Sequence, residues 1–465
     1  MQKNRVYPKM FCQGKYATNI DIMKKNLLIM LLSLALVSCS DTHIDEELQN
    51  PNKNDSSIED VIDDEDEEGE SIVHPYRKPY QPIYLNEIES TINKHQSDFS
   101  LNLFKAARNE RADENFVISP YSVSTALSML ANGADGNTLI ELQNVLSGEG
   151  LTLCDLNEYN KRIASEIDTI DNFTQLEIAN GLFPDKNVAL SGQFIDNNKS
   201  FYYASVIPVN FSNLAECNPI LNKWVDDATH GLIKNMSVSA YTPILIANTI
   251  YFKSSWERYF DKDYTYDAPF YNYDNTMSTV KMMRGGNIDY TIDGDFAIIG
   301  IPFGNRAFSM YVAYNYVDKN YSLNGIEKIL TKDNIKKYIS KRQGHGSIRI
   351  PRFEVGISGI KINNLLSMIG LKDLFSEKTD LSNLFTDKEN RSFKPAIFHE
   401  CVLRVEESGT EGAAKTQMVL IGATPNKPEL KSFMIDHPFV FWIAEQSTGT
   451  MLFMGQINKL ESVNE

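Results

Sequence analysis

The stretch DHPFVFWIAE at residues 436–445, followed by TGTMLFMGQI at 448–457, decides the fold. Both runs are rich in large apolar residues, which predicts strands at 437–443 and 450–457. Segments of the same character lie upstream, and they predict further strands at 244–252, 297–303, 308–315, 347–355 and 398–405.

Helical periodicity precedes and separates these strands. It predicts helices at 86–108, 120–132, 218–229 and 361–370. Ser119 supplies an N-cap for the second helix, Pro120 takes its first position, and Gly370 ends the last one. Helices come first and mostly strands follow, which predicts an α+β domain built on large, mainly antiparallel sheets. Because the chain shows no linker or repeat after Pro79, we expect one domain over 79–460.

Short blocks along this domain keep a recognisable order. They are NFVISPYS at 115–122, ANGLF at 179–183, NKWV at 222–225 and ANTIYFK at 247–253, the last followed by Trp256. Together with the closing stretch, these blocks resemble the serpin family from about residue 85 to residue 460. The resemblance implies a serpin fold of three mainly antiparallel β-sheets, about eight to nine helices and an exposed reactive-centre loop, here 408–432.

The same resemblance implies a mechanism. In serpins a protease cleaves the loop and forms an acyl-enzyme, and the loop then inserts as a new strand into the central sheet. Insertion releases stored strain and distorts the protease before deacylation. The chain is therefore expected to be a suicide-substrate inhibitor of serine proteases and not an enzyme.

The sequence ESGTEGAAKT at 407–416 is similar to the serpin hinge, the part of the loop that enters the sheet first. The resemblance assigns the hinge to Glu407, Gly409, Thr410, Glu411, Gly412, Ala413 and Ala414. Alternate residues of an inserted strand face inward, and here those residues are small, neutral or apolar: Thr410, Gly412, Ala414, Thr416, Met418 and Leu420. Since Lys415 falls on the outward face, the loop is expected to insert.

The reactive bond follows from the hinge. With Glu407 counted as the first residue, the family pattern makes the seventeenth, Ala423, the residue before the bond, which places the bond at Ala423–Thr424. A small apolar residue before the bond suits elastase-like or subtilisin-like proteases, with papain-like cysteine proteases as a further option at neighbouring bonds. It offers nothing to a trypsin-like pocket, which requires Arg or Lys.

By resemblance, four residues take the shutter positions, where the central sheet parts, and one takes the breach position at its top. The shutter residues are Ser119, Ser122, Asn248 and His399, and the breach residue is Trp256. Each is also the kind of residue that occurs as a satisfied core polar or aromatic group. Their expected role is to tune sheet opening, not to perform chemistry.

The N-terminal region is typical of an export signal. Residues 1–38 are expected to be an upstream extension plus a signal peptide, with translation starting at Met23 before an apolar run at 27–37. The end of this run resembles a bacterial lipoprotein box, which implies lipidation of Cys39. Residues 39–78 are acidic and poor in apolar residues, and therefore predict a disordered tether. The protein is expected on a Gram-negative outer membrane, facing outward or into the periplasm.

The net charge of -16 is concentrated in this tether, where residues 40–70 hold fourteen acidic residues against Lys53. Clustered Lys and Arg are needed for phosphate binding, so nucleic acid is not expected as a partner. No metal or cofactor pattern is present in the sequence, and we expect a monomer. The spacing of the cysteines predicts that Cys154, Cys217 and Cys401 are buried free thiols.

A structural surface lipoprotein that merely binds host molecules is one alternative to inhibition, and it would leave an intact bait loop unexplained. Two other functions also compete with inhibition. One is a non-inhibitory serpin-fold binding module on the cell surface, which the small inward residues of the hinge disfavour. The other is a hydrolase that uses Ser119 and His399. No Gly-x-Ser-x-Gly sequence surrounds Ser119, and Ser119-Pro120 is typical of a helix cap instead.

Overall fold

A buried helix, α3 (Pro120–Ala131), packs against strands of two β-sheets. The computed structural model describes residues 77–462, with gaps at 237, 241, 259, 318–321, 341–342, 388–394, 396 and 411–430. Ala126 is the one residue of α3 that is not fully buried, as expected for a helix enclosed on all sides. Ser119 caps this helix by accepting a hydrogen bond from the Ser122 backbone N–H at 3.1 Å, with Pro120 at the first position. The predicted start of the helix is confirmed.

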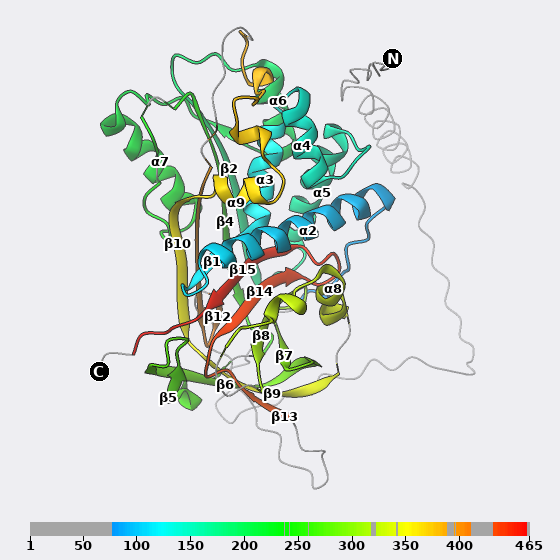
Figure 1. The fold of residues 1–465 in the computed structure, drawn as a ribbon, viewed down its shortest axis with the longest axis vertical. Helices are drawn as coiled ribbons and strands as arrows, with labels where there is room; N and C mark the ends of the chain where they lie inside the picture. Colours follow the sequence, from blue (N-terminus) through cyan, green and yellow to red (C-terminus); the bar gives the residue numbers. More distant parts are fainter. Residues whose placement is uncertain are drawn as a thin grey trace, which may run out of the picture. The chain divides into compact units, whose positions relative to one another are not determined.

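The smaller sheet, called the central sheet below, has six strands in the order β10-β11-β12-β4-β2-β3. Their bounds are β10 (Phe353–Lys361), β11 (Phe398–Glu406), β12 (Gly409–Thr410), β4 (Ile244–Ser255), β2 (Thr174–Pro184) and β3 (Ser205–Val206). All neighbours are antiparallel except β2 and β3. Figure 1 shows the long strands of this sheet running along the long axis of the molecule.

The second sheet has nine strands, in the order β1-β15-β14-β8-β7-β6-β9-β13 with β5 paired to β6. Their bounds are β1 (Phe116–Ile118), β15 (Met451–Ile457), β14 (Phe439–Glu445), β8 (Phe308–Asn315), β7 (Phe296–Pro302), β6 (Met277–Asp293), β9 (Gly344–Pro351), β13 (Lys431–Met434) and β5 (Tyr266–Tyr271). The long β6 pairs with β7 at one end and with β9 and β5 along the rest, so the second and third sheets expected from the sequence form one continuous ladder.

Eight α-helices lie in the described part of the chain, which agrees with the expected eight to nine. Besides α3 they are α2 (Glu87–Glu110), α4 (Gly136–Leu146), α5 (Leu153–Thr169), α6 (Gly192–Tyr202), α7 (Leu214–Ala228), α8 (Lys332–Ser340) and α9 (Asn363–Met368). One-turn 3₁₀ helices lie at Lys262–Tyr264, Ile326–Lys328, Asp373–Phe375 and Ser382–Leu384. The α+β serpin fold predicted from the sequence is confirmed.

Two predicted elements differ from the observed ones. The helix expected from 218 begins at Leu214, because the Asn213 side chain caps it by accepting from the Glu216 N–H, and Pro219 lies inside the helix. The strand expected over 347–355 is two strands, since β9 ends at Pro351 and β10 starts at Phe353. Arg352 lies at the break, and its side chain has a role described below.

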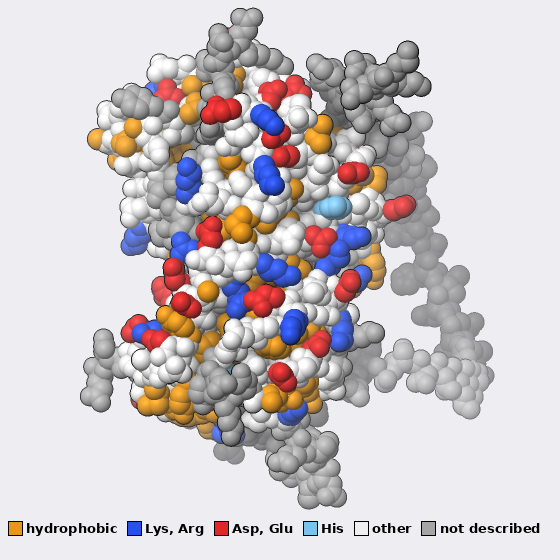
Figure 2. Space-filling model, viewed as in Figure 1, with side chains coloured by type: hydrophobic (Ala, Val, Ile, Leu, Met, Phe, Trp, Pro, Cys, Tyr) orange, Lys and Arg blue, Asp and Glu red, His pale blue; other side chains and the backbone are white. Residues whose placement is uncertain are grey.

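Three further observations concern the charges on the surface, the cysteines and the apolarity of the helices. On the face shown in Figure 2, basic and acidic side chains are interspersed. Cys217 and Cys401 are buried free thiols as predicted, whereas Cys154 is disulfide-bonded, so that prediction is wrong for Cys154. Among the described residues, no helix combines the length and apolarity needed to cross a bilayer.

Candidate functional site

The predicted hinge begins inside the central sheet. After β11 ends at Glu406, the chain turns and Gly409 and Thr410 form β12. Gly409 pairs with Glu406 of β11 on one side and with Ser255 of β4 on the other, and Thr410 pairs with Val405 and Ser254. Two residues of the hinge, Gly409 and Thr410, therefore already occupy a strand position between β11 and β4.

Gly409 has a backbone conformation that only glycine adopts readily. Its φ is +135°, and a Cβ atom there would overlap the Ser254 backbone oxygen. The close approach of this residue to β4 therefore depends on the absence of a side chain. Thr410 is 1% exposed, and its hydroxyl oxygen accepts a hydrogen bond from the Ser254 backbone N–H at 3.3 Å.

Glu407 anchors the turn through a buried carboxylate. Its side chain accepts hydrogen bonds from Arg352 Nε at 2.7 Å and from the Thr265 hydroxyl at 2.6 Å, and Arg352 Nη2 lies at 2.5 Å. Its backbone oxygen accepts from the Phe260 N–H at 3.2 Å. Burial alone would raise the pKa of Glu407, but the bonds from Arg352 and Thr265 outweigh it, so the pKa of Glu407 is lowered. The carboxylate is thus held charged at neutral pH.

Trp256 links the start of the hinge to the second sheet. It is fully buried, and its indole Nε1–H donates to the Glu406 backbone oxygen at 2.9 Å. Its ring stacks on Phe303 with centroids 4.3 Å apart and an interplanar angle of 10°. The predicted breach residue therefore holds the last residue of β11, immediately before the turn into the hinge.

The four predicted shutter residues come together at the N-terminus of α3. The Ser119 backbone N–H donates to His399 Nε2 at 3.0 Å, and the Ser122 hydroxyl donates to the Asn248 backbone oxygen at 3.3 Å. Asn248 Nδ2 donates to Asn180 Oδ1 at 2.6 Å. One helix end therefore contacts both β11, through His399, and β4, through Asn248. These are the two strands that flank the hinge, so the helix end lies beneath the position where an inserted strand would enter.

His399 is neutral in this arrangement. Burial lowers the pKa of His399 from 6.5 to about 4, because the imidazolium would lose its hydration. A neutral ring can accept the Ser119 N–H at Nε2. The hydroxyl oxygen of Ser119 instead accepts from the Ser122 N–H, as a helix cap does. This geometry uses the serine and the histidine structurally and does not pair them as nucleophile and base.

Three residues of the site have no place in the sequence-based prediction. Asn180 lies within the ANGLF block and could have been noticed there as a buried polar residue, since it is 8% exposed. No sequence pattern marked Arg352 or Thr265, because their contact with Glu407 brings together three segments that lie far apart along the chain. The remaining predicted site residues, Glu411, Gly412, Ala413, Ala414, Ala423, Thr424 and Cys39, lie outside the described residues.

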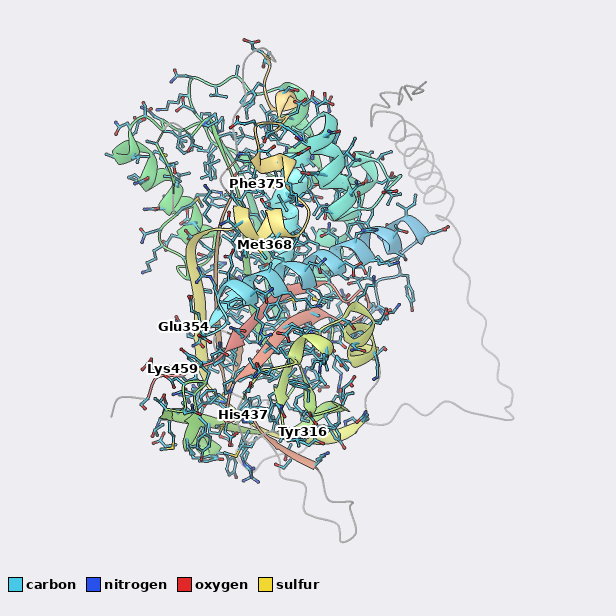
Figure 3. All side chains as sticks on the ribbon, viewed as in Figure 1. Tyr316, Glu354, Met368, Phe375, His437 and Lys459 are labelled. Carbon is cyan, nitrogen blue, oxygen red and sulfur yellow. The ribbon has the colours of Figure 1, made fainter. Side chains whose placement is uncertain are left out.

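The downstream end of the reactive-centre loop returns at β13. This strand runs parallel to β9 at the edge of the second sheet. His437 follows it and lies near Tyr316 at the same end of the molecule, as Figure 3 shows. The His437 ring contacts the Asp436 carboxylate through Nδ1 at 2.7 Å and the Asn315 backbone oxygen through Nε2 at 2.8 Å. These contacts fix the chain after the loop to β8.

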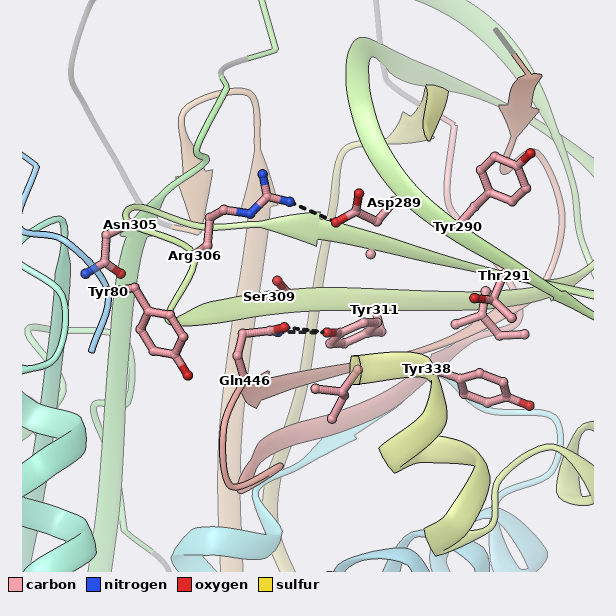
Figure 4. A pocket seen from close by; sticks show the side chains of 13 residues that line it. Tyr80, Asp289, Tyr290, Thr291, Asn305, Arg306, Ser309, Tyr311, Tyr338 and Gln446 are labelled. Carbon is pink, nitrogen blue, oxygen red and sulfur yellow. Dashed lines mark hydrogen bonds and ion pairs between the residues drawn. The ribbon is translucent and has the colours of Figure 1, made fainter. Parts of the chain in front are cut away.

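A cavity of about 200 Å³ lies away from the hinge, against β6, β7, β8 and α8. Figure 4 shows two pairs among its polar side chains. Arg306 Nη2 lies 2.8 Å from the Asp289 carboxylate, and the Tyr311 hydroxyl donates to Gln446 at 3.1 Å. Within the described part of the chain, no cluster of His, Cys, Asp and Glu could hold a metal ion. Neither observation assigns a cofactor site.

Residues 94–460 match the model of one protein family, described as serpin (serine protease inhibitor). The chain belongs to the serpin family. It is 28% identical over 399 residues to human serpin B3, covering 79% of this chain and 99% of that protein. It is 30% identical over 382 residues to leukocyte elastase inhibitor A of Rattus norvegicus, covering 79% and 98%.

A solved structure supports the fold. The native state of tengpin, a thermophilic serpin, matches with a TM-score of 0.70 at 24% identity, over 82% of this chain and 97% of that chain. At this identity the likeness speaks for the fold alone. It agrees with the element order and with the two sheets that enclose α3 in this serpin.

Proposed function

We propose that this serpin is a suicide-substrate inhibitor of proteases, which traps its target by inserting the cleaved loop into the central sheet. The observation that carries the proposal is the strand position of Gly409 and Thr410 between β11 and β4. Because Gly409 and Thr410 already pair with both β11 and β4, insertion of the loop requires only that the residues after Thr410 extend the same pairing. Relatives named as elastase inhibitors, at 28–30% identity, support inhibition in general.

The proposed reactive bond is Ala423–Thr424, and the proposed targets are elastase-like or subtilisin-like serine proteases. Ala423 suits a shallow pocket and gives a trypsin-like pocket no cation to bind. Ala423 is the residue at the position where the family pattern, counted from Glu407, puts the reactive bond. Papain-like cysteine proteases stay a second class of target, at the neighbouring bonds.

The test is incubation of the purified protein with pancreatic-type elastase, subtilisin, chymotrypsin and trypsin, followed by denaturing gels and intact mass. An adduct that survives denaturation, with a released peptide beginning at Thr424, supports both inhibition and the bond. The variant Ala423→Arg should move adduct formation towards trypsin while leaving the described body unchanged. Cleavage without any adduct, by all four proteases, would overturn inhibition and favour the surface binding module.

The proposed location is the cell envelope, with the body tethered by a lipid on Cys39. The lipoprotein-like sequence before Cys39 and the acidic segment after it support this proposal. Mass spectrometry of the mature N-terminus tests it directly. A mature chain that starts elsewhere than Cys39, or a Cys39 sulfur bonded to Cys154 instead of to a lipid, would refute the anchor without affecting inhibition.

A further inference from the structure

A chain of buried amide groups continues from the shutter into the helices. Asn180 Nδ2 donates to the backbone oxygen of Tyr202, the last residue of α6, at 2.8 Å. The Tyr202 hydroxyl donates in turn to Asn157 Oδ1 on α5 at 2.7 Å. Since Asn180 also accepts from Asn248, these bonds connect β4 and β2 of the central sheet with α6 and α5.

The chain ends at the C-terminus of α3. Asn132, the C-cap of that helix, exchanges two hydrogen bonds with Asn157, at 2.8 and 3.1 Å. Asn197 of α6 donates a further bond to Asn132 Oδ1 at 3.1 Å. Asn132, Asn157 and Tyr202 are 7%, 1% and 4% exposed, so these bonds are made away from bulk water. Breaking one of these hydrogen bonds would leave a buried polar group without a partner, which costs free energy. The series of bonds therefore resists being broken one at a time.

The two strands that flank the hinge are consequently tied to α3 unequally. The β4 side is held at the N-terminus of α3 through Asn248 and at its C-terminus through Asn180, Tyr202, Asn157 and Asn132. The β11 side is held at the N-terminus through the bond from Ser119 to His399. Figure 1 shows α5 and α6 beside α3, and α5 also contacts β2.

We propose that Tyr202 and Asn157 are positioning residues for sheet opening, which act through Asn180 and Asn248 to slow the parting of β4 from β11. Parting β4 from β11 requires both attachments to α3 to loosen, because α3 holds both strands. The amide chain, called the clamp here, makes the β4 side the firmer one. This inference rests on the proposed function, because it concerns the rate at which the loop enters the sheet.

The first test compares two variants that each remove one buried hydroxyl. Tyr202→Phe breaks the clamp at its centre. Tyr159→Phe, on helix α5 two residues from Asn157, removes a hydroxyl that accepts from Asn93 at 3.1 Å and lies outside the clamp. The measured quantity is the rate at which each protein, uncleaved and warmed, converts to a heat-resistant form with an inserted loop. A rate about 5-fold higher is expected for Tyr202→Phe, equivalent to about 1 kcal/mol for one buried hydrogen bond.

The control should convert at the wild-type rate even when its urea midpoint falls as far as that of Tyr202→Phe. Equal rates for the two variants at matched stability would show a general structural effect and overturn the proposal. A Tyr202→Phe rate equal to wild type would overturn it as well.

The second test uses the wild-type protein and is independent of any variant's folding. The clamp predicts slower amide hydrogen exchange in peptides from β2 than in peptides from β11. Amide hydrogen exchange in β2 as fast as in β11 would contradict the clamp.

Proteolytic cleavage within 411–430 separates this inference from the proposed function. If cleaved wild-type protein gains no heat resistance, loop insertion is refuted, while the exchange comparison still decides the clamp.

Discussion

The buried pair of Glu407 and Arg352 offers the sharpest test of how the hinge is held. Arg352→Ala would leave a carboxylate that is 1% exposed with the Thr265 hydroxyl as its remaining side-chain donor among the described residues. Hydrogen bonds to charged groups contribute about 1.5–3 kcal/mol each. The Arg352 side chain is 40% exposed, so water weakens the pair, and we expect the lower end of that range, about 1.5 kcal/mol.

The pH dependence of this loss distinguishes an electrostatic anchor from simple packing. In the wild type the folded-state pKa of Glu407 is lowered, so its contribution is present at neutral pH and is lost as the pH falls through the acidic range. In Arg352→Ala the effect of burial, which raises the pKa of Glu407, meets less opposition. The deficit in unfolding free energy should therefore be larger at pH 7.5 than at pH 5.

Urea unfolding at both pH values measures the deficit, and Arg404→Ala serves as the control. Arg404 pairs with Glu354 at 2.8 Å in the same sheet, but both side chains are largely exposed, so its loss should cost about 0.5 kcal/mol or less. The double variant Glu407→Gln with Arg352→Ala should recover part of the stability, because no buried charge is left unpaired. Two results would refute an electrostatic anchor. One is a loss of unfolding free energy that does not change with pH, and the other is that the losses from Arg352→Ala and Glu407→Gln simply add in the double variant.

Two further predictions concern the shutter and the turn. Because the pKa of His399 falls from 6.5 to about 4 on folding, the native state should lose up to about 3 kcal/mol as the pH drops from 6.5 to 4; urea midpoints should fall over this range less steeply in His399→Gln. Gly409→Ala should expel β12 from the sheet, because its φ of +135° disfavours a side chain. Hydrogen exchange at Ser254 and Ser255 should rise in this variant and stay unchanged in Gly192→Ala, where a Cβ meets nothing within 4 Å.

Local signals in the sequence predicted local structure well. The Ser119-Pro120 pair gave the start of α3, because capping depends on neighbours along the chain. The apolar runs at 437–443 and 450–457 became β14 and β15 with small shifts at their ends. Physical patterns alone led to the α+β class, whereas the hinge and the shutter required the resemblance to serpins.

Contacts between distant segments were not predictable in the same way. The apolar pattern places Arg352 inside one predicted strand, yet it lies between β9 and β10 and its side chain turns to Glu407. Asn180, Tyr202, Asn157 and Asn132 come from four separate segments, and no sequence pattern connects them. Their pairing depends on the register of β2 with β4 and on the packing of α5 and α6, which a pattern along the chain does not contain.

The register of β12 makes a final prediction about the inserted state. Gly409 pairs with Ser255 and Thr410 with Ser254, antiparallel, so each further inserted residue should face the preceding residue of β4. If this register continues, Thr416 comes to lie opposite Asn248, on the face that contacts α3. Leu420 would then lie opposite Ile244, where β4 begins.

Insertion must therefore disturb the shutter after six residues beyond Thr410 have entered. Thr416→Asp would place a charge at the buried contact between Asn248 and the helix α3, where an unpaired carboxylate is costly. This variant should be cleaved at the normal rate but released as a substrate, with little covalent adduct. Lys415→Asp is the matched control, since residue 415 would face outward and should keep full adduct yield. Equal yields from the two variants would show that the inserted strand takes a different register from the one that Gly409 and Thr410 begin.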